Sequence, residues 1–473
     1  MKILLVLPAA ERVRVTGSNP RVPDRAMLRF SILPLTAVAA LTPEPHEVAI
    51  CDENVEAIDL GADVDLVAIS FMTAVANRAY DIARAFRARG VTVVAGGYHP
   101  TLCPEDAAPH FDALVRGDAE GAWPELLGDL EAGKLQPVYD HRGGSGLGGL
   151  PVPRRDLLER TAHHYVTTNA VQTGRGCRHD CKYCSIAAFH QGRYRRRPVE
   201  EVIAELEGMS REVLFVDDNI VSDPEYAAEL FRAMIPLRKR WVSQCSLMIA
   251  DDRELLELAH RAGCRGLFIG LETLSERNLE SMAKAFNDSR GYLTRTGAIR
   301  RAGIGIVAGI IVGMDHDEPT VFESTLHFLH QARIDAVQVN ILTPLPGTPL
   351  HESMKREGRI VDPDWDHYDF RHCVIEPKRM SREALQEGAD WIYCSFYRLD
   401  RILLRAIRAF FSAGPLPAWL GWKLGLTYRR DLRRERVRGR NPAREHGISH
   451  HPGIRRRGVP HQPRPDRAVS QGA

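Results

Sequence analysis

The stretch GRGCRHDCKYCSI, residues 174–186, places three cysteines within eight positions: Cys177, Cys181 and Cys184. The chain has only nine cysteines among its 473 residues, so this Cys-x3-Cys-x2-Cys spacing is improbable by chance. A simple packing role does not fit, because the residues between the cysteines are mostly charged. The spacing therefore indicates a metal site.

Two kinds of metal site remain open for the three thiols. A structural zinc site needs a fourth ligand and usually pairs two Cys-x2-Cys knuckles, and His179 is too close in sequence to complete that geometry comfortably. An iron–sulfur cluster held by three thiolates leaves one iron open to a small molecule, which favours chemistry over electron transfer alone. The other six cysteines stand singly and form no second motif.

Composition indicates a soluble globular protein with two or three domains, since 44% of the residues are hydrophobic and 26% are charged. No apolar run reaches the roughly 18 residues that span a bilayer. The N-terminal MKILLVLPAA is predicted to be a buried strand and not a signal peptide. We therefore expect a cytoplasmic protein, in which clustered cysteines more often bind metal than form disulfides.

The formal net charge of +2 is unevenly distributed. Residues 428–473 contain thirteen arginines and no lysine, against four acidic residues, and are predicted to form a disordered tail. The preceding PAWLGWKLGL, residues 417–426, adds two tryptophans. Because Trp and Arg suit the membrane interface, the tail is a candidate for peripheral contact with an anionic membrane.

Residues 1–140 alternate short apolar runs with helical stretches, which predicts a doubly wound, Rossmann-like α/β domain with a parallel sheet. The runs are KILLVLP, HEVAICDEN, VDLVAISFMT and VTVVAGGYHPT. Ligands bind at the carboxyl ends of such strands. The polar residues at those ends are Glu53 and the candidate ligand residues Asp52, Asn54, Ser70, Thr73, Gly96 and Gly97.

Residues 141–164 are rich in Gly and Pro and are predicted to be a linker. From 165 to 380 the strand–helix alternation resumes with six strand candidates, which predicts a partial (β/α)6, TIM-like barrel with functional residues at the carboxyl ends of its strands. Residues 381–427 are predicted to be mainly helical.

The cysteine loop, with Tyr183 just before its third cysteine and the first strand of a six-unit barrel before it, resembles the radical S-adenosylmethionine (SAM) superfamily. The resemblance implies that Cys177, Cys181 and Cys184 hold a 4Fe-4S cluster, and that SAM binds its open iron. Reduction of the cluster then cleaves SAM to a 5′-deoxyadenosyl radical. An external donor of the flavodoxin or ferredoxin type would supply the electron.

The resemblance also assigns SAM contacts, to which Tyr183 belongs. Asp217, Asp218 and Asn219 follow the second barrel strand, where the family usually has Gly-Gly-Glu. A helix N-cap explains Asp218 or Asn219 equally well. The remaining candidate SAM contacts are Glu272, at the end of the fourth strand, and Gly309 and Gly313, in the glycine-rich fifth strand.

The N-terminal domain resembles the cobalamin-binding domain of one branch of this superfamily, so that the resemblance covers about residues 1–400. The family signature Asp-x-His-x-x-Gly would supply a histidine to cobalt. The corresponding stretch here, residues 52–57, has neither the histidine nor the glycine. Cobalamin is therefore expected without a protein His ligand, unless the domain no longer holds it.

The resemblance implies a cobalamin-dependent radical SAM methyltransferase that acts on an unactivated carbon of a small-molecule or lipid substrate. A radical cyclase or rearrangement enzyme without methyl transfer is the alternative. An RNA-modifying methylthiotransferase is disfavoured. Enzymes of that kind carry three further cluster cysteines in an N-terminal domain and an RNA-binding barrel at the C-terminus, whereas here only Cys51 and Cys103 precede Cys177 and no such barrel is predicted. Nucleic acid is therefore not an expected partner.

Overall fold

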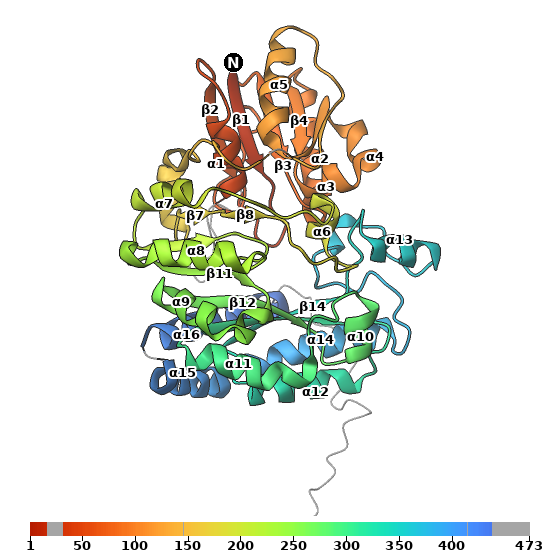
Figure 1. Ribbon diagram of the computed structural model, residues 1–473. Coiled ribbons are helices and arrows are strands. Elements are labelled where there is room, and N and C mark those ends of the chain that lie inside the picture. The colour runs from red at the N-terminus through yellow and green to blue at the C-terminus, as the bar shows by residue number, and fades with distance from the viewer. Residues whose placement is uncertain (17–31, 145, 414, 438–473) are drawn as a thin grey trace, which may run out of the picture. The chain divides into compact units, whose positions relative to one another are not determined.

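The computed structural model describes residues 1–16, 32–144, 146–413 and 415–437. One compact unit, Met1–Leu432, contains two six-stranded sheets that follow one another along the chain (Figure 1). Most of the predicted tail, residues 438–473, lies outside the described residues.

The first sheet is parallel throughout, with the order β2-β1-β3-β4-β5-β6. This confirms the predicted doubly wound fold, in which the strand order reverses between β1 and β3. The sequence analysis did not predict the last two strands, β5 and β6. The strands are β1 (Lys2–Leu7), β2 (Glu47–Asp52), β3 (Leu66–Ser70), β4 (Thr92–Gly96), β5 (Ala113–Gly117) and β6 (Val138–His141).

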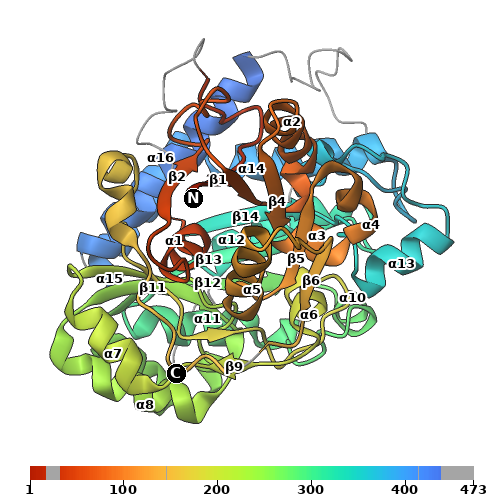
Figure 2. The same cartoon turned by 90° about the horizontal axis from the view of Figure 1, so that it is seen from above.

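Helices cover both faces of this sheet (Figure 2). Helix α2 (Ala76–Arg87) buries Phe86 and its neighbours against one face. Helices α1 (Leu33–Ala40) and α5 (Ala119–Glu131) bury an apolar set that includes Trp123 against the other. The short helices α3 (Tyr98–Leu102) and α4 (Pro104–Ala107) follow β4.

The second sheet is also parallel throughout, with the order β14-β13-β12-β11-β10-β7. Its first and last strands do not pair with each other, so the barrel is open, as predicted. The strands are β7 (Ala170–Val171), β10 (Glu212–Phe215), β11 (Arg240–Cys245), β12 (Cys264–Glu272), β13 (Gly305–Val312) and β14 (Ala336–Ile341).

Helices of the strand–helix units pack on the outer face of this sheet (Figure 1). They are α7 (Val199–Glu207), α8 (Pro224–Met234), α9 (Arg253–Arg261), α11 (Tyr292–Arg301) and α12 (Thr320–Gln331). The predicted linker 141–164 contains the last residue of β6 and the whole of a 3₁₀ helix, Arg155–His164.

The hydroxyls of two tyrosines form hydrogen bonds with backbone groups of β14, at the open edge of the barrel. The hydroxyl of Tyr397 accepts a hydrogen bond from the backbone N–H of Val337 (2.9 Å) and donates one to its carbonyl oxygen (2.8 Å). The hydroxyl of Tyr393 accepts from the N–H of Val339 (2.9 Å). Helix α14 (Arg382–Phe396), which carries Tyr393, thus pairs backbone groups that an edge strand would otherwise leave open.

The C-terminal region is helical, as predicted, and consists of α14, α15 (Leu399–Ala413) and α16 (Pro415–Val437). The predicted disorder is wrong for residues 428–437, which belong to α16. Arg and Leu favour helices, and no Gly or Pro interrupts the chain between Leu426 and Gly439. Among the described residues, no helix is long and apolar enough to cross a membrane.

We expect replacement of Tyr397 by Phe to lower the free energy of unfolding by about 2 kcal/mol, because two buried backbone groups of Val337 lose their partner. Urea denaturation measures the change. Tyr428→Phe is the control, since its hydroxyl accepts from the side chain of Gln338 (3.0 Å) and not from a backbone group of Val337. Equal, small effects of the two changes would contradict this role for Tyr397.

Candidate active site

The three cysteines lie on the loop between β8 (Gly174–Arg175) and α6 (Ser185–His190), and all three are free thiols. Strand β8 pairs with β9 (Arg195–Arg196) and closes the base of the loop. Gly176 begins the loop with a φ of +83°, and a Cβ there would lie 2.0 Å from the carbonyl oxygen of Arg193. Only glycine fits at this entry to the loop.

Among the described residues, no three His, Cys, Asp or Glu side chains converge on a single metal ion. The three thiolates that hold a four-iron cluster need no such convergence, because each binds a different iron. The donor set of three free thiols on one loop therefore fits a cluster of this kind.

The loop is fixed at its middle by Lys182. Its backbone N–H donates to the carbonyl oxygen of Met282 (3.1 Å), and its own carbonyl accepts from the N–H of Leu350 (3.0 Å). Its ammonium group donates to the carbonyl oxygen of Ser281 (2.9 Å). These contacts tie the cysteines to the ends of α10 (Glu276–Ser281) and α13 (Pro349–Arg356).

Asp217 holds the chain that leads into the cysteine loop. Its carboxylate accepts hydrogen bonds from the N–H of Thr173 (3.1 Å), the hydroxyl of Thr173 (2.6 Å) and the N–H of Gly174 (2.7 Å). Burial raises the pKa of Asp217 to about 6, while the donors around it lower the pKa. The carboxylate oxygens are therefore used within the protein.

Asp218 and Asn219 lie beside the loop itself. Asp218 accepts from the N–H of Gly176 (2.8 Å), and burial raises its pKa to about 7. The amide nitrogen of Asn219 lies 4.0 Å from the sulfur of Cys177, and its oxygen accepts from the N–H of Ser246 (2.9 Å). The alternative N-cap role is wrong for both, because Asp223 caps α8.

Glu272 ends β12 with a φ of +67°, next to an irregularity in the pairing of β12 with β13. Its carboxylate pairs with the ammonium group of Lys284 at 2.5 Å, and that group lies 5.9 Å from the ring centroid of Tyr183. Burial opposes the charge of Lys284, but Glu272 and Cys181 outweigh it and raise its pKa. Lys284 lies in no motif, so the sequence analysis missed it.

The two glycines of the fifth barrel strand both have local structural reasons. A Cβ on Gly309 would lie 3.0 Å from the ring of Phe268. Gly313 has a φ of +94°, and a Cβ there would lie 2.5 Å from the side chain of Leu385. A contact of these glycines with adenine stays a prediction.

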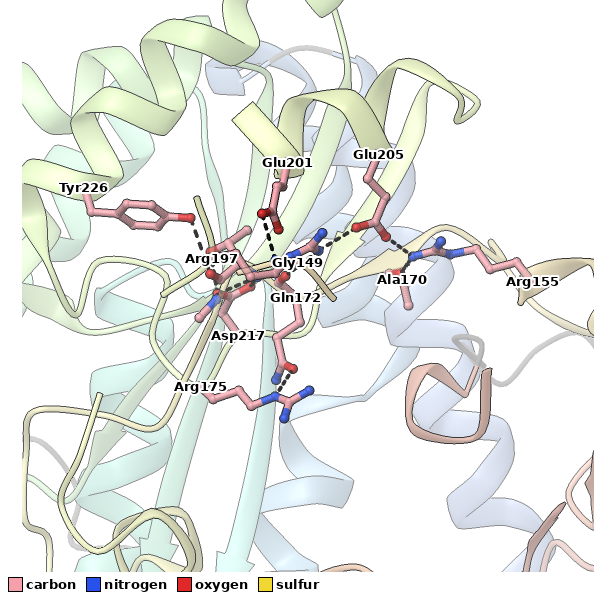
Figure 3. Close-up of polar contacts among 12 residues, drawn as sticks. Gly149, Arg155, Ala170, Gln172, Arg175, Arg197, Glu201, Glu205, Asp217 and Tyr226 are labelled. Carbon is pink, nitrogen blue, oxygen red and sulfur yellow. Dashed lines mark hydrogen bonds and ion pairs between the residues drawn. The ribbon is translucent and has the colours of Figure 1, made fainter. Parts of the chain in front are cut away.

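Side chains also satisfy the second open edge of the barrel, at β7 (Figure 3). Arg155 donates to the carbonyl oxygen of Ala170 (2.5 Å), and Arg197 donates to that of Gln172 (3.2 Å). Both guanidinium groups pair at 2.5 Å with Glu205, whose side chain is buried. Two buried cation–carboxylate contacts thus hold the strand that leads to the cluster loop.

A cavity of about 420 Å³ reaches from the first sheet to the region of the cluster loop. At the ends of β3 and β4 it is lined by Ser70, Gly96 and Gly97. Gly97 has a φ of +99°, and a Cβ there would lie 2.8 Å from the carbonyl oxygen of Phe71. Apolar residues of α1 and α5 line its sides, and Gln172, Arg175, His190 and Asp218 line its far end.

The other three candidate cobalamin contacts lie outside the lining of this cavity. Asp52 accepts from the hydroxyl of Tyr165 (2.9 Å) and from the amide nitrogen of Asn54 (2.8 Å). The hydroxyl of Thr73 lies 3.2 Å from Nδ1 of the buried His99. The structure thus brings only half of the predicted set together.

Ion pairs join the two halves of the cavity wall. Asp118, which precedes α5, pairs with Arg175 of β8 at 3.1 Å and also with Arg195 of β9. Glu120 pairs with Arg175 at 2.5 Å. The first sheet and the base of the cluster loop are therefore held together at the cavity. The sequence analysis assigned a role to neither carboxylate.

Two family models match the chain. The model of the radical SAM superfamily matches residues 171–360, and that of the B12 binding domain matches residues 31–127. The first match contains the cysteine loop and five of the six barrel strands, with the start of β7 just before it. The second contains β2 to β5.

Curated relatives cover most of the chain. It is 31% identical to bacteriochlorophyllide d C-12(1)-methyltransferase of Chlorobaculum tepidum, over 79% of this chain and 84% of the relative. It is 30% identical to hopanoid C-2 methylase of Rhodopseudomonas palustris, over 70% and 65%. The solved structure of TsrM, a radical SAM methyltransferase of Kitasatospora setae, has the same fold, with a TM-score of 0.65, 16% identity and coverage of 93% and 100%.

The chain belongs to the radical SAM superfamily and, within it, to the methyltransferases that carry a B12-binding domain. The cofactors of this family are a 4Fe-4S cluster, SAM and cobalamin.

We expect replacement of Asp217 by Ala to release the chain before Cys177 and to lower the iron bound after anaerobic reconstitution, although all three cysteines remain. The free energy of unfolding falls by about 3 kcal/mol, because three buried donors lose their acceptor. Iron content and urea denaturation measure the two effects.

Asp335→Ala is the matched control. Asp335 accepts from the N–H of Ile306 (2.9 Å) and from Arg300 (2.8 Å), away from the cysteine loop. It should lose stability and keep its iron. Full iron content in the Asp217 variant would show that the loop does not depend on this carboxylate.

Proposed function

We propose that this chain transfers a methyl group to an unactivated carbon atom of a small molecule, in the space between the cluster loop and the cavity of the first sheet. The observation that carries the proposal is the cavity itself. Its walls come both from the sheet that matches the B12 binding domain and from residues that flank the cluster loop, Arg175 and Asp218. One cavity thus adjoins both predicted cofactor sites.

In this proposal Cys177, Cys181 and Cys184 are the cluster ligands, and Asn219 orients Cys177 from 4.0 Å. Tyr183, Asp218 and the Glu272–Lys284 pair form the polar surroundings in which SAM binds. The bound cofactors supply a strong abstractor of hydrogen atoms and a transferable methyl group. The residues of the chain bind and orient them and exclude water.

The cavity is suited to the cobalamin tail. Its lining by the sheet, α1 and α5 is mainly apolar, and Gly96 and Gly97 let a ligand approach the backbone closely. The lining contains one histidine, His190, which belongs to α6 beside the cluster loop and not to the first sheet. Burial lowers its pKa to about 4. We keep the proposal that no imidazole of the first domain binds cobalt.

The names of the two curated relatives specify methylation at carbon, of a bacteriochlorophyllide and of a hopanoid. We propose a substrate of the same kind, a small molecule or lipid methylated at carbon, with a flavodoxin or ferredoxin as electron donor. Membrane contact through the predicted tail stays a prediction, because residues 438–473 lie outside the described part of the chain.

Ala37→Trp should block cobalamin binding, because Ala37 lines the cavity and an indole would fill part of it. Ala40→Trp is the matched control, since Ala40 lies on the same helix, is also half-buried and does not line the cavity. We expect the affinity for hydroxocobalamin to fall at least about tenfold in the first variant alone. Equal binding by both variants, measured by absorbance after gel filtration, would place cobalamin elsewhere.

The reaction is tested after anaerobic cluster reconstitution, with hydroxocobalamin, a strong reductant and SAM. Mass spectrometry should detect 5′-deoxyadenosine together with S-adenosylhomocysteine, the second only when cobalamin is present. Cys181→Ala should abolish both products, whereas Cys103→Ala, which lies outside the loop, should keep them. 5′-Deoxyadenosine without S-adenosylhomocysteine would exclude methyl transfer in favour of cyclisation or rearrangement.

A further inference from the structure

Helix α15 presents an apolar face to the solvent. Of the fifteen large apolar side chains that are exposed in the described part of the chain, five lie on this one helix. Their exposed fractions range from 48% to 83%. They are Leu399, Leu403, Ile407, Phe410 and Phe411, which we call the α15 stripe.

The five positions share one face, because residues at i, i+4, i+8, i+11 and i+12 lie on the same side of a helix. The opposite face packs on the protein through the buried Ile402 and Ala409. There the guanidinium group of Arg405 lies 3.9 Å from the ring centroid of Phe396 and donates to its carbonyl oxygen (2.8 Å). The helix is thus held by an inner face that contains an arginine, while its outer face is apolar.

A surface helix of a soluble protein normally has the reverse arrangement, with its apolar side inward. A contiguous apolar stripe of this kind marks a surface that contacts something else. Residues 438–473 are a poor cover, because they contain no Leu, Met, Phe, Tyr or Trp. This composition favours an occupant from outside the chain.

The charge around the stripe indicates which occupant fits. Between residues 398 and 437 the chain has ten Lys and Arg residues against three Asp and Glu residues. Arg401 and Arg408 are exposed on α15 itself, and Trp419 of α16 is exposed with Lys423 4.8 Å from its ring centroid. Apolar and aromatic side chains beside long cationic ones suit the interface of an anionic bilayer, where the cations reach the headgroups.

We propose that the α15 stripe docks the protein on the surface of an anionic lipid bilayer, with the helix in the plane of the interface. The surface is independent of residues 438–473, because its apolar side chains come from α15 and the exposed cations named above come from α15 and α16. It is also independent of the methyl transfer proposed above. Docking would bring a lipid-dissolved substrate to the enzyme without a membrane-spanning segment.

Sedimentation of the full chain with vesicles tests the proposal. Vesicles contain equal amounts of phosphatidylglycerol and phosphatidylcholine, at low salt, with pure phosphatidylcholine as the neutral comparison. The combined change Leu403→Gln, Ile407→Gln and Phe411→Gln leaves the charge of the chain unaltered. We expect it to lower the partition coefficient onto anionic vesicles by at least about tenfold.

The matched control makes the same three-residue change at Val138, Val152 and Val166, which are exposed valines outside α15. It should bind like the wild type, and both variants should unfold at the same temperature as the wild type because all six positions are exposed. Failure of the wild type to sediment overturns the proposal. Unchanged binding of the stripe variant overturns it too, and would assign binding to charge alone.

A second copy of the chain is the competing occupant. Sedimentation velocity separates the two cases. A wild-type dimer that becomes monomeric in the stripe variant, without a change in vesicle binding, would mean that the stripe is a dimer interface and that the membrane proposal is wrong. A wild-type monomer whose vesicle binding needs the stripe supports it.

Discussion

An open barrel of six parallel strands leaves unpaired backbone groups at both of its edges, and the structure depends on how these groups are satisfied. In a closed barrel each strand would pair with two neighbours. Here β14 pairs with the hydroxyls of Tyr393 and Tyr397, and β7 with the guanidinium groups of Arg155 and Arg197. Side chains thus replace the strands that would otherwise close off the barrel, and the open edge at β7 is where the cysteine loop begins.

The two edges are satisfied by different chemistry, and the difference follows from their surroundings. At β14 neutral hydroxyls suffice, because Tyr397 is fully buried among apolar and aromatic neighbours. At β7 the donors are charged and share one buried carboxylate, Glu205. Removal of one member of such a group leaves a buried charge without a partner. This destabilises the folded state by more than the intact pair stabilises it. The charged arrangement therefore specifies a single position for β7.

Much of this fold was predictable, because it rests on local patterns. Apolar runs and amphipathic stretches predicted the first four strands of the first sheet and all six barrel strands, and the cysteine spacing predicted the loop. Strands β5 and β6 were missed because their sequences, ALVRG and VYDH, contain few consecutive apolar residues. Lys284 and Asp118 were missed for another reason, since each meets its partner only through the fold. No pattern within either segment signals those contacts.

The three residues of the Asp-Asp-Asn run, 217–219, make different contacts. Asp217 binds the backbone before the loop, Asp218 binds its first residue, Gly176, and Asn219 approaches Cys177 itself. The residue that lines the cavity is Asp218 alone. Asp118 and Glu120 pair with Arg175 of the short strand β8, which leads into the cysteine loop. These buried ion pairs therefore link the first sheet to the cysteine loop. The ion pairs that link the two predicted cofactor sites are therefore part of the cavity wall itself.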